Sequence, residues 1–174
     1  MKPPTAAHAQ EVSVPDASLD AAIRDALQKP SGPLTQQDLL SLTNLQARAR
    51  GIRSLEGLEA AANLTVLDLR SNSLSAVIVP SGLTKLATLD LGQNPLANCT
   101  IPESLTNLQR VLMEAAALTD LTLPPNLTML TELSLPRNRF NARNASMPSG
   151  RLCMSSRGES ILLRDEEGYP AAAF

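Results

Sequence analysis

The middle of the sequence has a 22-residue repeat, and this period limits the possible fold more than any other feature. Each copy follows the pattern L-x-x-L-x-L-x-x-N-x-L, and four copies begin at Leu64, Leu86, Leu108 and Leu130. A degenerate copy, LTNLQARARGI, begins at Leu42 in the same phase. Because five segments keep one phase, we interpret them as structural units that stack on one another.

The leucine spacing within a copy predicts a short strand followed by a turn. In LTVLDLRSNSL, Leu67 and Leu69 are two residues apart, so both point to the same face of an extended chain. Leu74 then returns beneath the strand. The segments that join the copies contain proline at 80, 102 and 124, which opposes a long helix, so we expect them to be extended or to form one 3₁₀ turn. The strands would then stack as a parallel sheet.

The asparagine of the motif occupies a position among apolar neighbours. Its amide can donate and accept, so it can satisfy backbone groups that the bend after the strand exposes inside the core. We therefore expect an asparagine ladder of Asn72, Asn94 and Asn138. The third copy has Ala116 at this position, which predicts a locally weaker coil in which water or a shifted backbone replaces the side chain. The alternative is a kink that exposes a partner site.

Two short helices are predicted before the repeats. Leu19, Ile23 and Leu27 lie at four-residue spacing after a start signal at Pro15-Asp16, which places them on one helix face. The stretch TQQD at 35–38 resembles a capping box ahead of a second helix. We expect both helices to cover the open edge of the first coil, as a solenoid requires for solubility.

These patterns divide the chain into four parts: an N-terminal segment 1–11, a helical cap 12–41, the repeats 42–140 and a tail 141–174. The first segment contains Ala-His-Ala without a preceding apolar stretch, so it is either the remnant of a signal peptide or a chance match. The tail could form a hairpin from RLCMS and SILLR, or it could begin a further domain.

The repeat and the cap resemble bacterial internalin-like leucine-rich-repeat proteins over roughly residues 12–140. The stretches VPDASLDAAIRDAL and PLTQQDLLSLTNLQARARGIRSLEGLE carry the resemblance to the cap and first coil. It implies an α/β fold, a short horseshoe solenoid with a concave parallel β-sheet, that binds other macromolecules and commonly acts outside the cell. An extracellular or cell-surface location is expected if an upstream signal peptide is missing from this frame. Arg50, Met113 and Ala116 depart from the motif.

Stacking would align the variable strand positions in columns on the concave face. This face carries a mixed, mild charge, with Leu112 as its main apolar residue and arginines as its candidates for binding hot spots. We expect a solvated, non-enzymatic surface on which a protein partner docks. The predicted contact residues are Arg48, Asp68, Arg70, Asp90, Arg110, Leu112 and Glu114.

Composition argues against several other functions. The net charge is −2, which gives no sign of a nucleic-acid surface, and no apolar run is long enough to span a membrane. The single histidine, His8, lies before the predicted cap, so no catalytic triad or histidine metal site is expected. Cys99 and Cys153 lack metal spacing, and we interpret them as unpaired thiols. Neither a cofactor nor a metal ion is predicted.

Two other functions remain open from the sequence alone. The chain could be a structural spacer or a truncated fragment of a longer secreted repeat protein. It could also be a hydrolase that uses Asp68 and Asp90, since neighbouring strands would hold their carboxylates near the separation found in retaining glycosidases. The same two carboxylates could instead bind a cation weakly. We interpret the four N-x-[ST] sequons, at Asn63, Asn98, Asn126 and Asn144, as by-products of repeat phrases such as Asn-Leu-Thr.

Overall fold

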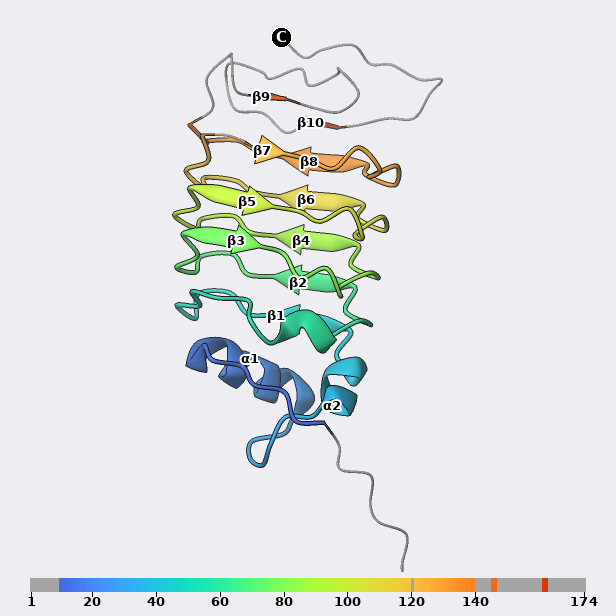
Figure 1. Cartoon of the computed structure of the whole chain (residues 1–174). Helices are drawn as coiled ribbons and strands as arrows, with labels where there is room; N and C mark the ends of the chain where they lie inside the picture. Colours follow the sequence, from blue (N-terminus) through green and yellow to red (C-terminus); the bar gives the residue numbers. More distant parts are fainter. Residues whose placement is uncertain (1–9, 120, 140–144, 147–160, 163–174) are drawn as a thin grey trace, which may run out of the picture.

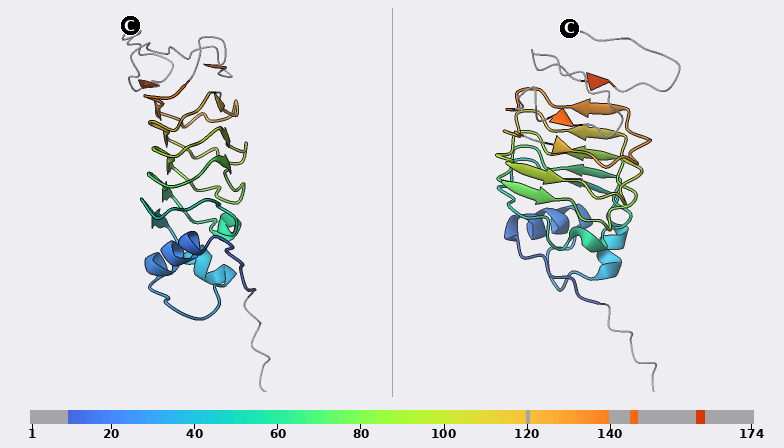
Figure 2. Two further views of the ribbon diagram at one scale, coloured as in Figure 1. Left: turned by 90° about the vertical axis from the view of Figure 1, so that its left-hand side faces the viewer. Right: turned by 45° about the horizontal axis from the view of Figure 1, so that its top comes forward.

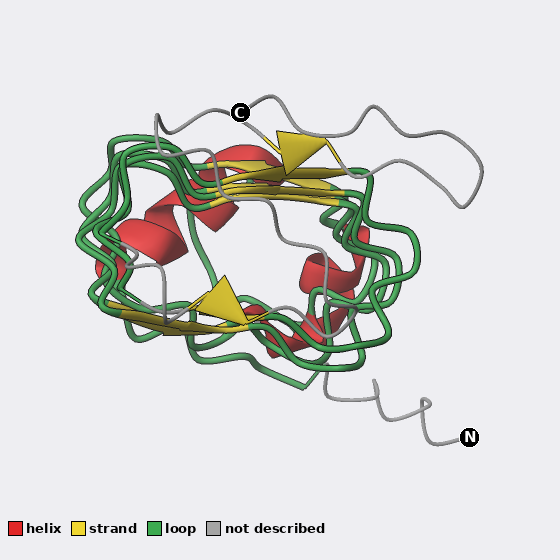
Figure 3. Ribbon diagram, turned by 90° about the horizontal axis from the view of Figure 1, so that it is seen from above, coloured by secondary structure: helices red, strands yellow, loops and turns green. Residues whose placement is uncertain are grey.

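The computed structural model describes residues 10–119, 121–139, 145–146 and 161–162. The chain winds as a stack of flattened coils, with one sheet along each broad side and the core between them (Figure 1, Figure 3). We call the six-stranded sheet, in the order β1-β2-β4-β6-β8-β10, the front sheet, although it lies behind the other in Figure 1. The four-stranded sheet, in the order β3-β5-β7-β9, is called the rear sheet. This is the leucine-rich-repeat solenoid that the constant repeat period predicts.

Each copy of the motif supplies one strand to the front sheet. Its parallel strands are β1 (Asn44–Gln46), β2 (Val66–Asp68), β4 (Thr88–Asp90), β6 (Arg110–Leu112) and β8 (Glu132–Ser134). In every neighbouring pair, the residues that lie side by side are one period apart in the sequence, as in Leu67 with Leu89. The predicted columns therefore exist.

The segments that join the copies are extended, as the prolines predicted. They form the rear strands β3 (Ala76–Ile78), β5 (Asn98–Thr100) and β7 (Leu121–Thr122). β9 (Ala145–Ser146), which follows the last copy, continues this sheet, and all four strands run parallel to one another. A tight turn follows at the proline, where the Leu83 N–H donates to the Pro80 carbonyl at 3.2 Å. Only the first coil of the described part has a 3₁₀ turn instead, η1 (Leu58–Ala60).

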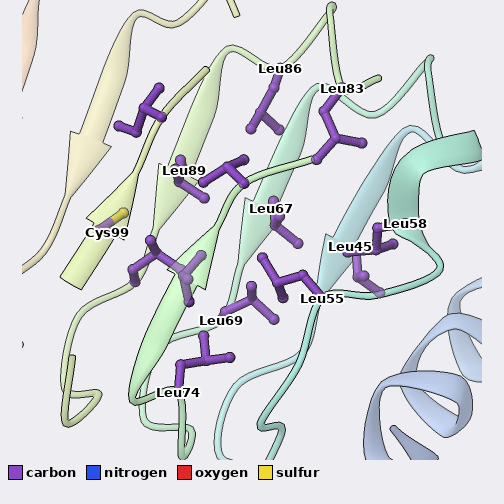
Figure 4. Packing of buried hydrophobic residues seen from close by; sticks show 14 of the residues in the cluster. Leu45, Leu55, Leu58, Leu67, Leu69, Leu74, Leu83, Leu86, Leu89 and Cys99 are labelled. Atoms are coloured by element: carbon purple, nitrogen blue, oxygen red, sulfur yellow. The ribbon is translucent and has the colours of Figure 1, made fainter. Parts of the chain in front are cut away.

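The core is built from aliphatic side chains that come from both sheets. The motif leucines, such as Leu64, Leu67, Leu69 and Leu74, are fully buried (Figure 4). Cys99 packs among them from the rear strand β5, and its burial raises the pKa of the thiol to about 12. It is a free cysteine, as expected. Each coil buries its leucines only against its neighbours, so stability accumulates along the stack.

The two predicted helices close the first coil. Helix α1 (Ala17–Leu27) packs on β1, and α2 (Gln36–Ser41) begins with the capping box between Thr35 and Asp38 (Figure 2). Leu19 and Ile23 are buried on the face that the spacing indicated. The Lys29 ammonium and the Thr35 hydroxyl beside Asp38 lower the pKa of that carboxyl to about 2.

Asp16 holds the cap to the first coil, a role that sequence analysis did not foresee. One carboxylate oxygen caps α1 by accepting from the Ser18 and Leu19 amides at 2.9 and 3.0 Å. The other accepts from the Arg53 and Ser54 amides at 2.7 and 3.1 Å. Although partial burial opposes it, these four backbone bonds lower the pKa of Asp16.

The asparagines bond across successive coils. The Asn72 carbonyl oxygen accepts from the Arg50 and Ile52 amides of the preceding coil, both at 3.0 Å. Its amide group donates to the carbonyls of Ala47 and Leu69, both at 2.7 Å. Equivalent bonds surround Asn94 and Asn138. Each asparagine of the ladder thus bonds to backbone groups at the bend of its own coil and at the bend of the preceding coil.

The backbone adjusts where the ladder lacks its asparagine. Ala116 cannot reach the Leu96 amide, which donates instead to the Asn94 carbonyl at 2.8 Å. The residue after the vacant position is left-handed in both copies without the asparagine, with φ of 75° at Gly51 and 63° at Ala117. The shifted backbone that Ala116 predicted is thus present. Ala117 is strained, because only glycine adopts this region freely.

The described C-terminal strands extend both sheets. β9 continues the rear sheet in parallel, whereas β10 (Ile161–Leu162) pairs antiparallel with β8. The predicted hairpin of 151–155 with 160–164 lies mostly outside the described residues, and so do Cys153 and Asn144. None of the helices in the described part is long and apolar enough to cross a bilayer.

Candidate functional site: the front face of the solenoid

The exposed side of β1, β2, β4, β6 and β8, with the residues that follow each strand, is here called the front face. It is the surface that sequence analysis expected on the concave side. All seven residues of the predicted docking site belong to it, namely Arg48, Asp68, Arg70, Asp90, Arg110, Leu112 and Glu114. Their side chains form separate pairs and clusters.

Arg48 and Asp68 form an ion pair between neighbouring coils. The Arg48 Nε lies 2.5 Å from Asp68 Oδ2, and the other Asp68 oxygen accepts from the Arg70 amide at 3.2 Å. Residue Asp68 is only 8% exposed. The solvated carboxylate expected here is therefore covered, because the neighbouring arginine folds over it.

Asp90 lies directly beside Asp68 in the register of the sheet and is 5% exposed. One of its oxygens accepts from the Gly92 amide at 2.9 Å. Burial is the main cause that raises the pKa of Asp90, and the Asp68 charge adds to it, whereas the Gly92 bond and the Arg70 and Arg48 charges oppose it. The Arg70 guanidinium forms its ion pair with Glu114 and not with either aspartate.

Arg70 reaches Glu114, which belongs to the coil after next. The Arg70 terminal nitrogen lies 2.9 Å from one Glu114 oxygen, and Arg137 lies 2.9 Å from the other. Gly92 occupies the same phase in the intervening coil. A Cβ there would lie 3.2 Å from the Arg70 guanidinium and 3.1 Å from the Asp90 carboxylate. The absent side chain leaves space for Arg70 to cross.

Arg110 and Glu132 form another pair, from β6 to β8, with Nε 2.6 Å from Oε2. Leu112 lies two residues from Arg110 on the same strand and is partly exposed. Arg137 and Glu132 are functional candidates that sequence analysis did not name. Arg137 lies about one repeat period after Glu114, and Glu132 lies one period after Arg110. Because one period separates neighbours in adjacent coils, this offset is the sequence signal that could have revealed both pairs.

The surroundings of Asp68 and Asp90 bear on the hydrolase and cation alternatives. Neither aspartate lines the open cavity of about 380 Å³ between α1 and β1, whose walls are Ala22, Asp25, Ala26, Asn44, Gln46 and Arg50. Within the described ranges, no three His, Cys, Asp or Glu side chains are placed to hold a metal ion. The Asp68 carboxylate is already paired with the Arg48 guanidinium.

Among the described sequons, two are engaged in backbone contacts. The Asn63 amide donates to the Leu40 carbonyl and the Asn126 amide to the Glu103 carbonyl, each at 2.7 Å. Asn98 lies exposed on β5. The side chains of Asn63 and Asn126 thus each link their own coil to the preceding segment of the chain.

Comparison with known proteins agrees with this architecture. The family profile described as Leucine Rich Repeat matches residues 63–86 and 85–108. No curated protein sequence matches the chain.

Three similar solved structures come from Listeria monocytogenes. Internalin C2 is 25% identical over 76% of this chain, with a TM-score of 0.62. Internalin InlF is 28% identical over 72%, with a TM-score of 0.51, and the functional domain of InlJ is 26% identical over 72%, with a TM-score of 0.65. The chain spans 64%, 44% and 28% of the lengths of these structures. The motif, its phase and these likenesses support a leucine-rich-repeat protein that is similar to the bacterial internalins.

Proposed function

We propose that the protein is a non-enzymatic binding module and that a protein partner docks on the front face. The proposed role as a binding module rests on the fold, since leucine-rich-repeat solenoids of the internalin type are protein-interaction modules. The observation that carries the choice of face is a pair of ion-pair groups, Arg48–Asp68 and Arg70–Glu114–Arg137, which hold charged side chains in fixed positions along the front face. Pre-ordered side chains lose less conformational entropy when a partner binds.

The rear sheet is a weaker candidate. Its described outward side chains include Ala76, Ile78, Asn98, Thr100 and Thr122, none of which carries a charge. The front face offers guanidinium groups, and arginine is enriched among residues that dominate binding energy.

A charge-reversal experiment tests the choice of face. The partner is isolated by affinity capture on the full chain, and its binding is then measured to the double variant Asp68→Lys/Arg70→Glu. The matched control, Thr100→Lys/Thr122→Glu, introduces the same charges on the rear sheet. We expect the front-face variant to weaken binding at least tenfold, whereas the control binds normally. Circular dichroism melting shows whether both variants remain folded.

The opposite result, in which only the rear-sheet variant loses affinity, would move the docking site to the other side of the solenoid. If the partner bound both variants as tightly as it binds the wild type, both sheets would be excluded as the docking site. Glycosidase and esterase assays on the protein and on Asp68→Asn complete the test, because any activity lost in the variant contradicts a non-enzymatic role.

We also propose that the protein acts outside the cell or at its surface, on the strength of its likeness to the internalins. Fractionation of the source organism, with an antibody to the chain and a cytosolic marker, tests this location. Recovery with the cytosolic marker alone would contradict it.

A further inference from the structure

The charges on the front face are unevenly distributed along the stack. At its β6–β8 end, three guanidinium groups meet two carboxylates: Glu114 is shared by Arg70 and Arg137, and Glu132 pairs with Arg110. We call the three guanidinium groups the arginine patch. The described part of this end therefore has an excess of positive charge.

The β1–β4 end has the opposite balance. Asp68 and Asp90 are adjacent on neighbouring strands, and Arg48 forms an ion pair with Asp68 only. Asp25 of α1 is paired with Arg50 at 2.6 Å and adds no net charge. An anionic partner is thus attracted to one end of the front face and repelled by the other.

The arginine patch has unused hydrogen-bonding capacity. In the described part of the chain, side-chain bonds engage one nitrogen of each guanidinium: a terminal one in Arg70 and Arg137, and Nε in Arg110. The side chains of Arg110 and Arg137 are 51% and 72% exposed. A guanidinium carries five donors in a planar fork that matches a carboxylate, so each can donate to a second carboxylate from outside.

The spacing within the patch matches an extended peptide. Arg110, Leu112 and Glu114 are successive alternate residues of one segment, so Leu112 lies between the Arg110 guanidinium and the cluster that Glu114 organises. At roughly 3.3 Å per residue, Arg110 and Leu112 are about 7 Å apart along β6, and Glu114 follows in the turn after the strand. An extended peptide has the same repeat, with residues i, i+2 and i+4 on one face.

We propose that the arginine patch binds an acidic segment of a protein partner with the pattern Glu-x-Leu-x-Glu in extended form. One carboxylate contacts Arg110, the other contacts the Arg70–Arg137 cluster, and the aliphatic side chain covers Leu112. The aspartates at the β1–β4 end repel the segment and so confine it to β6–β8. This inference rests on the proposed function and adds the chemistry of the partner.

A nuclear magnetic resonance titration tests it without a known partner. The isotope-labelled full chain is titrated with the peptide acetyl-Glu-Ser-Leu-Ser-Glu-amide to millimolar concentration. We expect saturable shifts in the Nε–H signals of Arg110 and Arg137 and in the methyl groups of Leu112. Affinity should fall as salt is added, because exposed charges are screened. The peptide with glutamine in place of both glutamates should not bind.

Two matched controls sharpen the result. The permuted peptide acetyl-Glu-Glu-Leu-Ser-Ser-amide keeps the composition but loses the spacing, and we expect about fivefold weaker binding from the loss of one or two exposed ion pairs. The protein variant Arg110→Gln/Arg137→Gln should lose the response, whereas Arg53→Gln/Lys85→Gln, which lies outside the front face, should keep it. All four side chains belong to exposed residues, so the fold should tolerate both changes.

Three outcomes would overturn the inference: no saturable shift, equal binding of the glutamine peptide, or shifts at Asp68 and Asp90 instead of the patch. None of them affects the proposed function, which depends on the capture experiment with the Asp68 and Arg70 variants. Conversely, the peptide could bind at the patch while the Asp68→Lys/Arg70→Glu variant still captures the partner with normal affinity. That result would contradict the proposal that the partner docks on the front face, but it would leave the acidic-segment site intact.

Discussion

Arg70 reaches Glu114 across an entire coil, passing over Gly92, and forms an ion pair of 2.9 Å with a residue 44 positions away. The contact joins β2 to the coil of β6, so it connects next-nearest neighbours of a solenoid in which each repeat otherwise contacts adjacent repeats. Both side chains are about one quarter exposed, at 26% and 23%.

This ion pair should make a measurable contribution to stability. In a double-mutant cycle with Arg70→Ala and Glu114→Ala, we expect a coupling energy of about 0.5–1 kcal/mol, measured by urea unfolding. The Arg110–Glu132 pair is the matched control, and it should give a smaller value because Arg110 is 51% exposed. A coupling energy of zero for Arg70 and Glu114 would show that the pair contributes nothing to the fold.

Asp16 should be the most sensitive polar residue of the cap. Replacement by alanine removes two bonds that cap α1 and two that hold the first coil, so we expect a loss of about 2–3 kcal/mol in the free energy of unfolding. Asp20→Ala removes only a partly exposed pair within α1 and should cost about 0.5 kcal/mol. Equal losses in the two variants would refute the double role of Asp16.

The contribution of Asp16 to stability should also depend on pH. Its pKa is lowered in the folded state, so the contribution is complete above the unfolded value near 3.8 and disappears as the pH falls through the folded value. The difference in unfolding free energy between wild type and Asp16→Asn should therefore shrink in acid. A difference that stays constant down to the acid limit of folding would contradict a role of the ionised carboxylate.

Asp90 should show the opposite dependence on pH. Its pKa is raised by burial, so the folded state favours the protonated form, and ionisation costs stability as the pH rises through the folded pKa. Asp90→Asn keeps an acceptor for the Gly92 amide and removes the charge. We expect this variant to be more stable than wild type at pH 7, with the gain vanishing below the unfolded pKa near 3.8.

Guanidinium unfolding at several pH values would measure this gain, and the control is Asp68→Asn. That variant should lose stability at pH 7, because Arg48 then lacks its carboxylate partner. If Asp90→Asn proved less stable than wild type at pH 7, its buried carboxylate would be stabilised by its surroundings rather than penalised.

Ala117→Gly should stabilise the protein. Ala117 has a φ of 63°, and relief of the left-handed strain is expected to add about 1 kcal/mol to the free energy of unfolding. Ser73→Gly lies in the same phase of a coil that has its asparagine, and residue 73 is not left-handed. There glycine should cost about 0.5 kcal/mol through backbone entropy. Thermal melting of both variants gives the comparison, and shifts of the same sign would show that the vacant ladder position does not control this turn.

The sequence alone determined the coil and its columns. A constant repeat period sets which residues are neighbours in adjacent coils, so Leu67, Asn72 and the register of Asp68 with Asp90 could be assigned from position alone. The helical cap was predictable for a related reason, because the leucine spacing of α1 and the capping box of α2 are local patterns.

Only the tertiary structure decided how the front-face side chains combine. Arg70 could have contacted Asp68 or Asp90, and the space over Gly92 together with the position of Glu114 directs it past both. The burial of Asp90, the double role of Asp16 and the left-handed Ala117 likewise depend on contacts between segments. A periodic sequence fixes backbone neighbours, but long side chains choose among several of them, and only the packed structure resolves that choice.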